Sequence, residues 1–124
     1  MRNVKQKGSK PELAVRHMLH SLGYRFRLHR KDYPGTPDIV LPKYRTVVFV
    51  HGCFWHGHDC RKGKLPATRR KFWKTKITKN KARDVDVTKA LEGMGYQVLV
   101  VWECQLKDKE ALAAYFRERL PKEN

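Results

Sequence analysis

The earliest hydrophobic positions of the chain recur with the spacing of an α-helix. They form one apolar stripe, which consists of Val15, Met18, Leu19 and Leu22. Ser9 followed by Glu12 fits a capping box, and Pro11 is tolerated in a first helical turn. Because glycine commonly ends a helix, the pattern predicts a helix that begins at Ser9 and stops at Gly23.

Three short strands are predicted after this helix. Tyr24, Phe26 and Leu28 alternate with two arginines, which is typical of a half-buried strand. A turn at residues 33–37 precedes a second strand at residues 38–41, which Pro42 closes. Residues 46–50 form a continuous apolar run. Such a run favours a strand that is buried on both faces.

The second half of the chain predicts a long helix, another buried strand and a last helix. Residues 67–94 have a helical but strongly basic pattern, and a break is expected near Asn80. The buried stripe of this segment is expected to be Val87, Ala90, Leu91 and Met94. Residues 96–102 form the next strand. Asp108 is expected to cap a last helix, which ends before Pro121 and buries Leu112, Tyr115 and Phe116.

The predicted order of elements is α-β-β-β-α-β-α. A buried strand, a long helix and a second buried strand favour a right-handed parallel crossover. The fold class is therefore α/β, with a mixed sheet flanked by helices. A chain of 124 residues is expected to form a single domain over residues 1–124.

Composition points to a polyanionic partner. The chain has 28 Lys and Arg against 12 Asp and Glu, a formal net charge of +16. Such a field attracts nucleic acid above all, although a basic protein can also bind an acidic protein. No apolar run approaches the length of a membrane span, and the first residues lack the apolar stretch of a secretory signal. Reduced thiols also suit a reducing compartment. We therefore expect a cytoplasmic, nucleoid-associated protein of bacterial type.

Residues 51–60 carry the densest set of metal-binding side chains. The stretch reads His-Gly-Cys-Phe-Trp-His-Gly-His-Asp-Cys. Zinc in structural sites is held by four thiolates and imidazoles. Cys53, Cys60 and the distant Cys104 supply three ligands, and His58 or His56 could be the fourth. The histidines left over, with His51, could move protons beside a basic surface, which suggests phosphodiester chemistry.

One acidic residue stands at a position where site residues often gather. Asp38 follows the Pro-Gly-Thr-Pro turn and opens a strand. A carboxylate in a basic environment can stay ionised and bind Mg2+ through oxygen. The alternative is that Asp38 only caps the turn.

The segment after the cysteine-rich loop is rich in positive charge. It contains Arg61, Lys62, Lys64, Arg69, Arg70, Lys71, Lys74, Lys76, Lys79, Lys81 and Arg83, with Phe72 and Trp73 among them. A run of charge is usually a solvated helix face. Here no acid occurs before Asp84, so local charge pairing cannot explain the run. Phosphate contacts by residues such as Arg69, Arg70, Lys71 and Lys74 are the better interpretation.

Together these blocks resemble one known family. Residues 35–38 (Gly-Thr-Pro-Asp), 47–60, 66–69 (Pro-Ala-Thr-Arg) and 101–104 (Val-Trp-Glu-Cys) look like the very short patch repair (Vsr) DNA mismatch endonucleases. The resemblance covers the chain from about Glu12 to Cys104 and keeps the order and spacing of every block. It implies a restriction-endonuclease-like core and agrees with the predicted order of elements.

The resemblance also implies roles for individual residues. Asp38 matches the acidic ligand of a catalytic Mg2+, and Val50 matches a residue that binds this ion through its backbone carbonyl, where the family often has Thr. His51 and His56 match two active-site histidines, and Glu12 matches an acid that approaches the waters of the metal. The zinc ligands would be Cys53, His58, Cys60 and Cys104. Phe54 and Trp55 match aromatics that wedge into the base stack at the mismatch.

Several of these positions have a plainer interpretation. Glu12 could serve only in the capping box. His51 could be a satisfied histidine at a strand end. Phe54 and Trp55 could be core aromatics, although their loop is too polar to bury them well and wedging side chains are of this type.

The function implied is Mg2+-dependent hydrolysis of one DNA strand beside a T:G mismatch, leaving a 5′-phosphate and a 3′-hydroxyl. His56 would be the general base, with His51 near the phosphate. Double-stranded DNA with a T:G mismatch would be the substrate of a monomeric enzyme that works with mismatch-repair proteins. Two alternatives stay open: a zinc-stabilised DNA-binding module without catalysis, and a related nuclease with another lesion preference. The arm before the first helix is shorter than is usual in the family, which predicts weaker affinity and mismatch selectivity.

Overall fold

The computed structural model describes residues 9–122 of the chain. The short N-terminal arm that the resemblance singles out, residues 1–8, lies outside them. The elements follow the predicted order, with three short 3-10 turns added. They are α1 (Lys10–Ser21), β1 (Arg27–Leu28), β2 (Ile39–Leu41), η1 (Pro42–Tyr44), β3 (Thr46–His51), η2 (Arg61–Gly63), α2 (Arg70–Gly93), β4 (Gln97–Trp102), η3 (Glu103–Lys107) and α3 (Lys109–Arg119).

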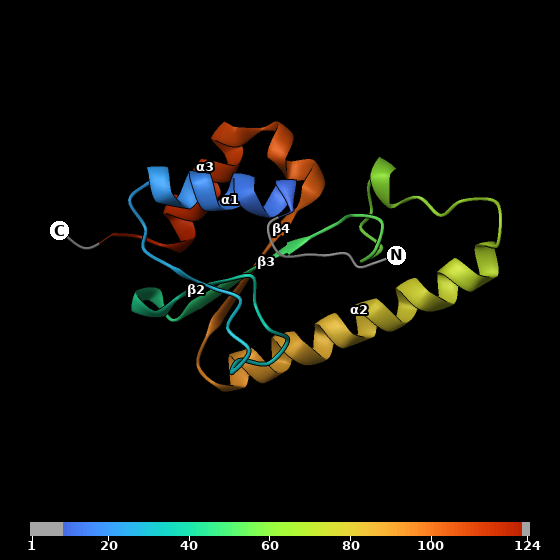
Figure 1. Cartoon of the computed structure of the whole chain (residues 1–124), viewed down its shortest axis with the longest axis horizontal. Helices are drawn as coiled ribbons and strands as arrows, with labels where there is room; N and C mark the ends of the chain where they lie inside the picture. The colour runs from blue at the N-terminus through green and yellow to red at the C-terminus, as the bar shows by residue number, and fades with distance from the viewer. Residues whose placement is uncertain (1–8, 123–124) are drawn as a thin grey trace.

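The four strands form one mixed sheet in the order β1-β2-β3-β4. β1 with β2 and β2 with β3 are antiparallel, whereas β3 and β4 are parallel, as the crossover pattern predicted. α1 and α3 lie together on one face of the sheet and α2 crosses the other (Figure 1). The α/β fold class and the order of its elements are therefore confirmed.

Hydrophobic side chains bury both faces of the central strands. On the α1 and α3 face, Val48 and Leu99 pack in a core with Leu19 and Phe116. On the α2 face, a smaller cluster joins Val40 and Val47 to Leu91 of the helix. Because successive strand residues point to opposite faces, a continuous apolar run is needed to fill both layers.

α2 differs from its prediction at both ends and in the middle. The helix starts at Arg70 and passes through Asn80 without a break. Asparagine is only a weak helix breaker, and the Asn80 side chain donates a hydrogen bond of 2.8 Å to the Trp55 carbonyl, which offsets that preference. Ala90 and Met94 are exposed because the contact with the sheet runs along Val87 and Leu91.

β1 is shorter than its alternating pattern predicted, because its partner β2 has only three residues. Tyr24 lies before the strand and is held by tertiary contact instead: its hydroxyl donates to the Leu120 carbonyl at 2.6 Å. Both predicted helix caps are present, with Ser9 Oγ accepting from Glu12 N–H and Asp108 accepting from Ala111 N–H. No helix within residues 9–122 is both long enough and apolar enough to cross a membrane.

Candidate active site and zinc site

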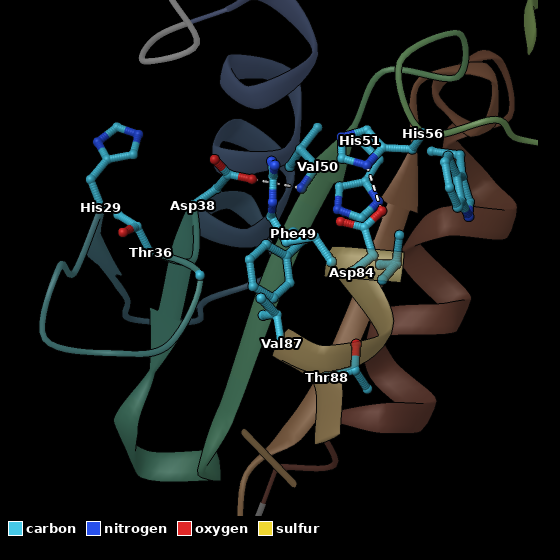
Figure 2. A pocket seen from close by; sticks show the side chains of 14 residues that line it. His29, Thr36, Asp38, Phe49, Val50, His51, His56, Asp84, Val87 and Thr88 are labelled. Atoms are coloured by element: carbon cyan, nitrogen blue, oxygen red, sulfur yellow. Dashed lines mark hydrogen bonds and ion pairs between the residues drawn. The ribbon is translucent and has the colours of Figure 1, made fainter. Parts of the chain in front are cut away.

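The strand register brings several predicted site residues to one end of the sheet. Leu28 pairs with Ile39, so that His29 N–H donates to the Asp38 carbonyl at 3.1 Å. Ile39 pairs with Val48, so Asp38 lies beside the carboxyl end of β3. This end of β3 lines a pocket of about 490 Å3 together with residues of β4 and α2 (Figure 2).

Asp38 occupies a largely buried position in this pocket. Its Oδ2 accepts a hydrogen bond of 2.7 Å from the backbone N–H of Val50. Burial raises the pKa of Asp38 to about 6, and this effect exceeds the lowering by the Val50 hydrogen bond. The neighbouring Glu12 contributes to this increase, while His29 and His56 act in the opposite direction. A buried carboxylate with a raised pKa favours a cation beside it, because the cation would offset the cost of ionisation.

Glu12 is almost fully enclosed, with 1% of its surface exposed. Oε2 accepts from Arg16 Nη2 at 2.8 Å and lies 2.8 Å from His29 Nε2. Oε1 has no hydrogen-bond partner among the described residues. The carboxylate is therefore turned away from the helix end, and the reciprocal half of the predicted capping box is not formed. Glu12, His29 and Asp38 each bring a ligand atom within 4.8 Å of the others.

These three residues are compatible with the Mg2+ that the family resemblance implies. Carboxylate oxygens are the donors that Mg2+ prefers, and the unpartnered Glu12 Oε1 is a buried acceptor of the kind that a cation or its water would satisfy. The donor set therefore fits a divalent cation.

The two loop histidines form a stacked pair. The rings of His51 and His56 are parallel within 3° and their centroids are 3.7 Å apart. His56 Nδ1 lies 2.6 Å from Oδ2 of Asp84, which comes from the middle of α2 (Figure 2). Since a carboxylate accepts hydrogen bonds, Asp84 favours the tautomer in which Nδ1 carries the proton. Nε2 of His56 is then left as the basic nitrogen.

The environment of His51 is different. Its side chain is buried, and its Nδ1 has no hydrogen-bond partner within the described part of the chain. Burial, and to a smaller extent the neighbouring His56, lower the pKa of His51 to about 4, against a weaker opposite effect of Asp84. His51 is therefore neutral near pH 7 and stacks on His56 as an uncharged ring.

The predicted zinc ligands meet beside this pocket. Cys53, His58, Cys60 and Cys104 each offer a ligand atom within 4.8 Å of the others. Cys104 reaches the loop because β3 and β4 are parallel and in register, with His51 opposite Trp102. Cys104 Sγ lies 3.5 Å from His58 Nδ1. A tetrahedron with zinc bonds of usual length has an edge of about 3.5 Å, so the spacing fits that ion.

Burial and neighbouring thiols disfavour the ionised form of Cys53 in the absence of metal. Desolvation, together with side-chain hydrogen bonds to Cys60 and Cys104, raises the pKa of the Cys53 thiol to about 12. A metal cation would reverse this preference and release protons on binding. Of the two histidines left open by spacing, His58 lies in the cluster with the three cysteines and His56 pairs with Asp84, so the arrangement favours His58 as the fourth predicted ligand.

Trp102 connects the two sites. Its ring stacks on His58 at 4.1 Å and lies edge-on to His51 at 5.1 Å. A structural change at the cysteine cluster would therefore be transmitted to the histidine pair through the rigid Trp102 side chain.

An aromatic cluster lies next to the loop and consists of Phe54, Trp55, Phe72 and Trp73. Trp73 contacts each of the other three rings edge-on, with centroids 5.0–5.6 Å apart. Trp55 is 48% exposed and Phe72 45% exposed. Side chains this large are seldom left exposed together, so the cluster is a candidate contact for nucleic-acid bases.

The basic residues predicted to bind DNA adjoin this cluster. Those of the first half of α2 are exposed, namely Arg70, Lys71, Lys74, Lys76, Lys79, Lys81 and Arg83, and so is Arg69 before it. This half of the helix extends beyond the sheet (Figure 1). The surface therefore offers phosphate-binding groups beside the exposed aromatics.

The structure thus brings Asp38, Val50, His51 and His56 to one pocket, with Glu12 adjoining Asp38. Two residues of this site have no assigned role in the sequence interpretation. For His29, the signal in the sequence is that it directly follows β1, opposite Asp38. Asp84 was noted only as the first acid after the basic run. Its spacing of 28 residues from His56 carries no local pattern that would have revealed the contact.

Carboxylates near a metal-compatible pocket, an imidazole base and an exposed basic helix define a class of protein, the nucleases that hydrolyse phosphodiesters. Comparison with known proteins agrees. A protein-family model described as "DNA mismatch endonuclease Vsr" matches residues 1–62. The type II nicking enzyme V.XorIIP of Xanthomonas oryzae pv. oryzae is 58% identical over 120 residues, which cover 97% of this chain and 88% of that protein.

Two further relatives support the same assignment. The type II nicking enzyme V.NmeAIP of Neisseria meningitidis is 52% identical and matches 97% of this chain and 83% of its own length. The DNA mismatch endonuclease Vsr of Escherichia coli is 43% identical and matches 90% of this chain and 72% of its own length. The chain belongs to the Vsr family and is a DNA nicking endonuclease.

Proposed function

We propose that this endonuclease nicks one strand of duplex DNA beside a T:G mismatch in a Mg2+-dependent reaction, and so starts very short patch repair. One observation carries the proposal. A carboxylate with a raised pKa and an Asp-oriented imidazole lie in the same pocket, next to exposed aromatics and a basic helix. A DNA-binding module without catalysis would need none of the pocket residues, and membership of an endonuclease family argues against it.

Asp38 and the backbone carbonyl of Val50 would hold the Mg2+, with Glu12 near its water ligands. When bound, the ion supplies positive charge to the phosphate and acidifies water. The chain's own contribution is to position Asp38, which it does through the Val50 N–H hydrogen bond. The Cys53, His58, Cys60 and Cys104 cluster would hold a structural zinc ion, because four protein ligands leave no open position for catalysis.

His56 would act as the general base. Its Nδ1 is directed to Asp84, so Nε2 is free to take a proton from the attacking water. The P–O3′ bond then breaks, and the leaving 3′ oxygen takes a proton from solvent. Asp84 would stabilise the imidazolium that forms, and the neutral His51 stacked beside it adds no repulsive charge.

Trp55, with Phe54 behind it, would wedge into the base stack at the mismatch. A mispaired step costs less to unstack than a paired one, which gives an aromatic wedge a preference for mismatches. The exposed basic residues Arg69, Arg70, Lys71 and Lys74 would hold the phosphates on either side.

The experiment that tests this proposal is strand nicking of an end-labelled duplex. A single T:G mismatch is compared with its T:A control, with Mg2+ and with a chelator, and the two strands carry different labels. A Mg2+-dependent nick in one strand of the T:G duplex only is the expected result. Equal cleavage of both duplexes would remove the mismatch specificity, and binding without a cut would overturn the proposed reaction.

A second candidate is a nicking activity with a different lesion preference. The chain is 58% and 52% identical to two type II nicking enzymes, but 43% identical to the E. coli mismatch endonuclease. This difference supports the second candidate. Duplexes that carry each of the other mismatches, tested in the same assay, separate the two candidates. Faster nicking at any mismatch other than T:G would favour the second.

A further inference from the structure

We propose that His29 is a direct nitrogen ligand of the cation site formed with Glu12 and Asp38, and that its imidazole makes the site prefer a first-row transition ion such as Mn2+ over Mg2+. The inference deepens the proposed function, because it concerns the ion that Asp38 holds. It adds a residue to which neither the sequence pattern nor the family resemblance assigned a role.

The contact between His29 and Glu12 is the first observation. His29 Nε2 lies 2.8 Å from Glu12 Oε2, yet Nε2 has no aligned hydrogen-bond partner within residues 9–122. A simple ion pair would be expected to align its N–H with the carboxylate. Two ligands on adjacent vertices of an octahedral ion approach each other to about 3 Å without such alignment. The contact is therefore compatible with two neighbouring ligands of one ion.

Unpartnered polar groups are the second observation. Glu12 is 1% exposed, and its Oε1 has no hydrogen-bond partner in the described part of the chain. Arg16 already bonds Oε2 through two nitrogens, at 2.8 and 3.2 Å, so charge pairing of Glu12 does not need His29. A buried carboxylate oxygen and a buried imidazole nitrogen that both lack a hydrogen-bond partner among the described residues indicate a ligand between them.

The backbone holds His29 toward this point. Its φ of 48° lies in the left-handed region, which is uncommon for a residue other than glycine. The hydrogen bond from His29 N–H to the Asp38 carbonyl, 3.1 Å, continues the β1–β2 pairing by one residue and stabilises this conformation. The side chain is therefore held on the same side as the Asp38 carboxylate and within 4.8 Å of it at the ligand atoms.

The choice of ion follows from the donor types. The oxygen donors of two carboxylates suit Mg2+, Ca2+ and Mn2+ alike. An imidazole favours transition ions, because these ions accept nitrogen ligands more readily than Mg2+ does. A site with two carboxylates and one imidazole should therefore discriminate between Mn2+ and Mg2+. With Mg2+ in excess the site would still be loaded, because the carboxylates remain.

The direct test is electron paramagnetic resonance of Mn2+ added to the zinc-loaded protein without DNA. Loss of the free-ion signal gives the dissociation constant of Mn2+, and competition gives that of Mg2+. Electron spin echo modulation then reports whether an imidazole nitrogen is coupled to the bound ion. We expect nitrogen coupling in the native protein. Coordination by oxygen alone would overturn the proposal.

The variant His29→Asn removes the imidazole and keeps a residue that tolerates the left-handed conformation. We expect Mn2+ affinity to fall on the order of tenfold, Mg2+ affinity to fall less, and the nitrogen coupling to disappear. His17→Gln, at an exposed histidine of α1, is the matched control and should leave all three unchanged. Circular dichroism checks that both variants are folded.

Two outcomes would refute the role of His29. Nitrogen coupling that persists in His29→Asn would place the ion at His51 and His56, which with Asp84 form the other histidine-containing group near the pocket. Equal losses of Mn2+ and Mg2+ affinity would mean that His29 acts only on the charge of Glu12. Because binding is measured without DNA, the ligand role of His29 can stand even if T:G nicking is not observed.

Discussion

Replacing Asp38 by asparagine should abolish nicking and at the same time stabilise the Mg2+-free protein. Asparagine keeps the size of the side chain, and its Oδ1 can still accept the Val50 N–H hydrogen bond of 2.7 Å. It removes a negative charge that burial disfavours. The free energy of unfolding should therefore rise where Asp38 would be ionised.

The magnitude follows from the pKa of Asp38, which rises from its ordinary value of 3.8 to about 6 in the folded protein. A raised pKa means that the folded state favours the protonated carboxyl. Its contribution to stability is fully present below pH 3.8 and is lost as pH rises through about 6. With a difference of about two pKa units, ionisation of Asp38 lowers the free energy of unfolding by about 3 kcal/mol at pH 8 and by roughly half of that at pH 5.

The assay is urea unfolding of the zinc-loaded native protein and Asp38→Asn without added Mg2+, followed by tryptophan fluorescence at both pH values. Asp38→Asn should be the more stable by up to about 3 kcal/mol at pH 8, and the difference should shrink by about 1.4 kcal/mol at pH 5. Mg2+ at about 100 times its dissociation constant should stabilise only the native protein, by about 2.7 kcal/mol.

A difference that does not change between pH 5 and pH 8 would refute the argument, because it would mean that Asp38 is not ionising with a raised pKa. A variant less stable than the native protein at pH 8 would do the same. The activity of the native enzyme offers an independent check. Nicking at fixed Mg2+ should increase as pH rises through about 6, since the ionised carboxylate is the form that binds the cation.

Three further substitutions test separate parts of the site. Asp84→Asn should slow nicking by roughly 10²- to 10⁴-fold at unchanged DNA affinity, because His56 loses its orienting carboxylate. The control is Asp86→Asn, on the exposed side of α2, and equal nicking rates of the two variants would contradict the prediction. Cys104→Ser should lose zinc, measured by plasma mass spectrometry, and lower the melting temperature, whereas one zinc per chain would refute the Cys3His site. Trp55→Ala should weaken binding to T:G duplex by about 1–3 kcal/mol with little change in stability, measured by fluorescence anisotropy against Leu13→Ala, and equal affinities would exclude the wedge.

Local patterns of sequence were sufficient for the elements of the fold. The stripe through Val15 and Leu19 and the apolar runs of β3 and β4 predicted a helix and two buried strands, because side-chain periodicity directly reflects which faces are covered. The caps at Ser9 and Asp108 are local for the same reason. The break predicted at Asn80 was wrong for the opposite reason, because a tertiary hydrogen bond to Trp55, which sequence spacing does not show, supports the helix there.

The thiols of the predicted zinc site could be named from the sequence because three cysteines leave few combinations. Only Cys53, Cys60 and Cys104 occur in the chain, so the set was determined by count. The histidine was not: His56 and His58 are two residues apart, and spacing allowed either. The preference for His58 comes from α2, which presents Asp84 to His56 and leaves His58 beside the cysteines.

The sequence by itself determined the secondary-structure elements, the positive charge, the thiols of the predicted zinc site and the blocks shared with one enzyme family. Only the tertiary structure decided which distant groups meet. Asp84 reaches His56 because α2 crosses the sheet face next to the loop, and His29 reaches Glu12 because β1 pairs with β2 and α1 packs over the same end. Such contacts depend on strand register and helix packing, which are set by the whole core and leave no periodic trace in the residues that make them.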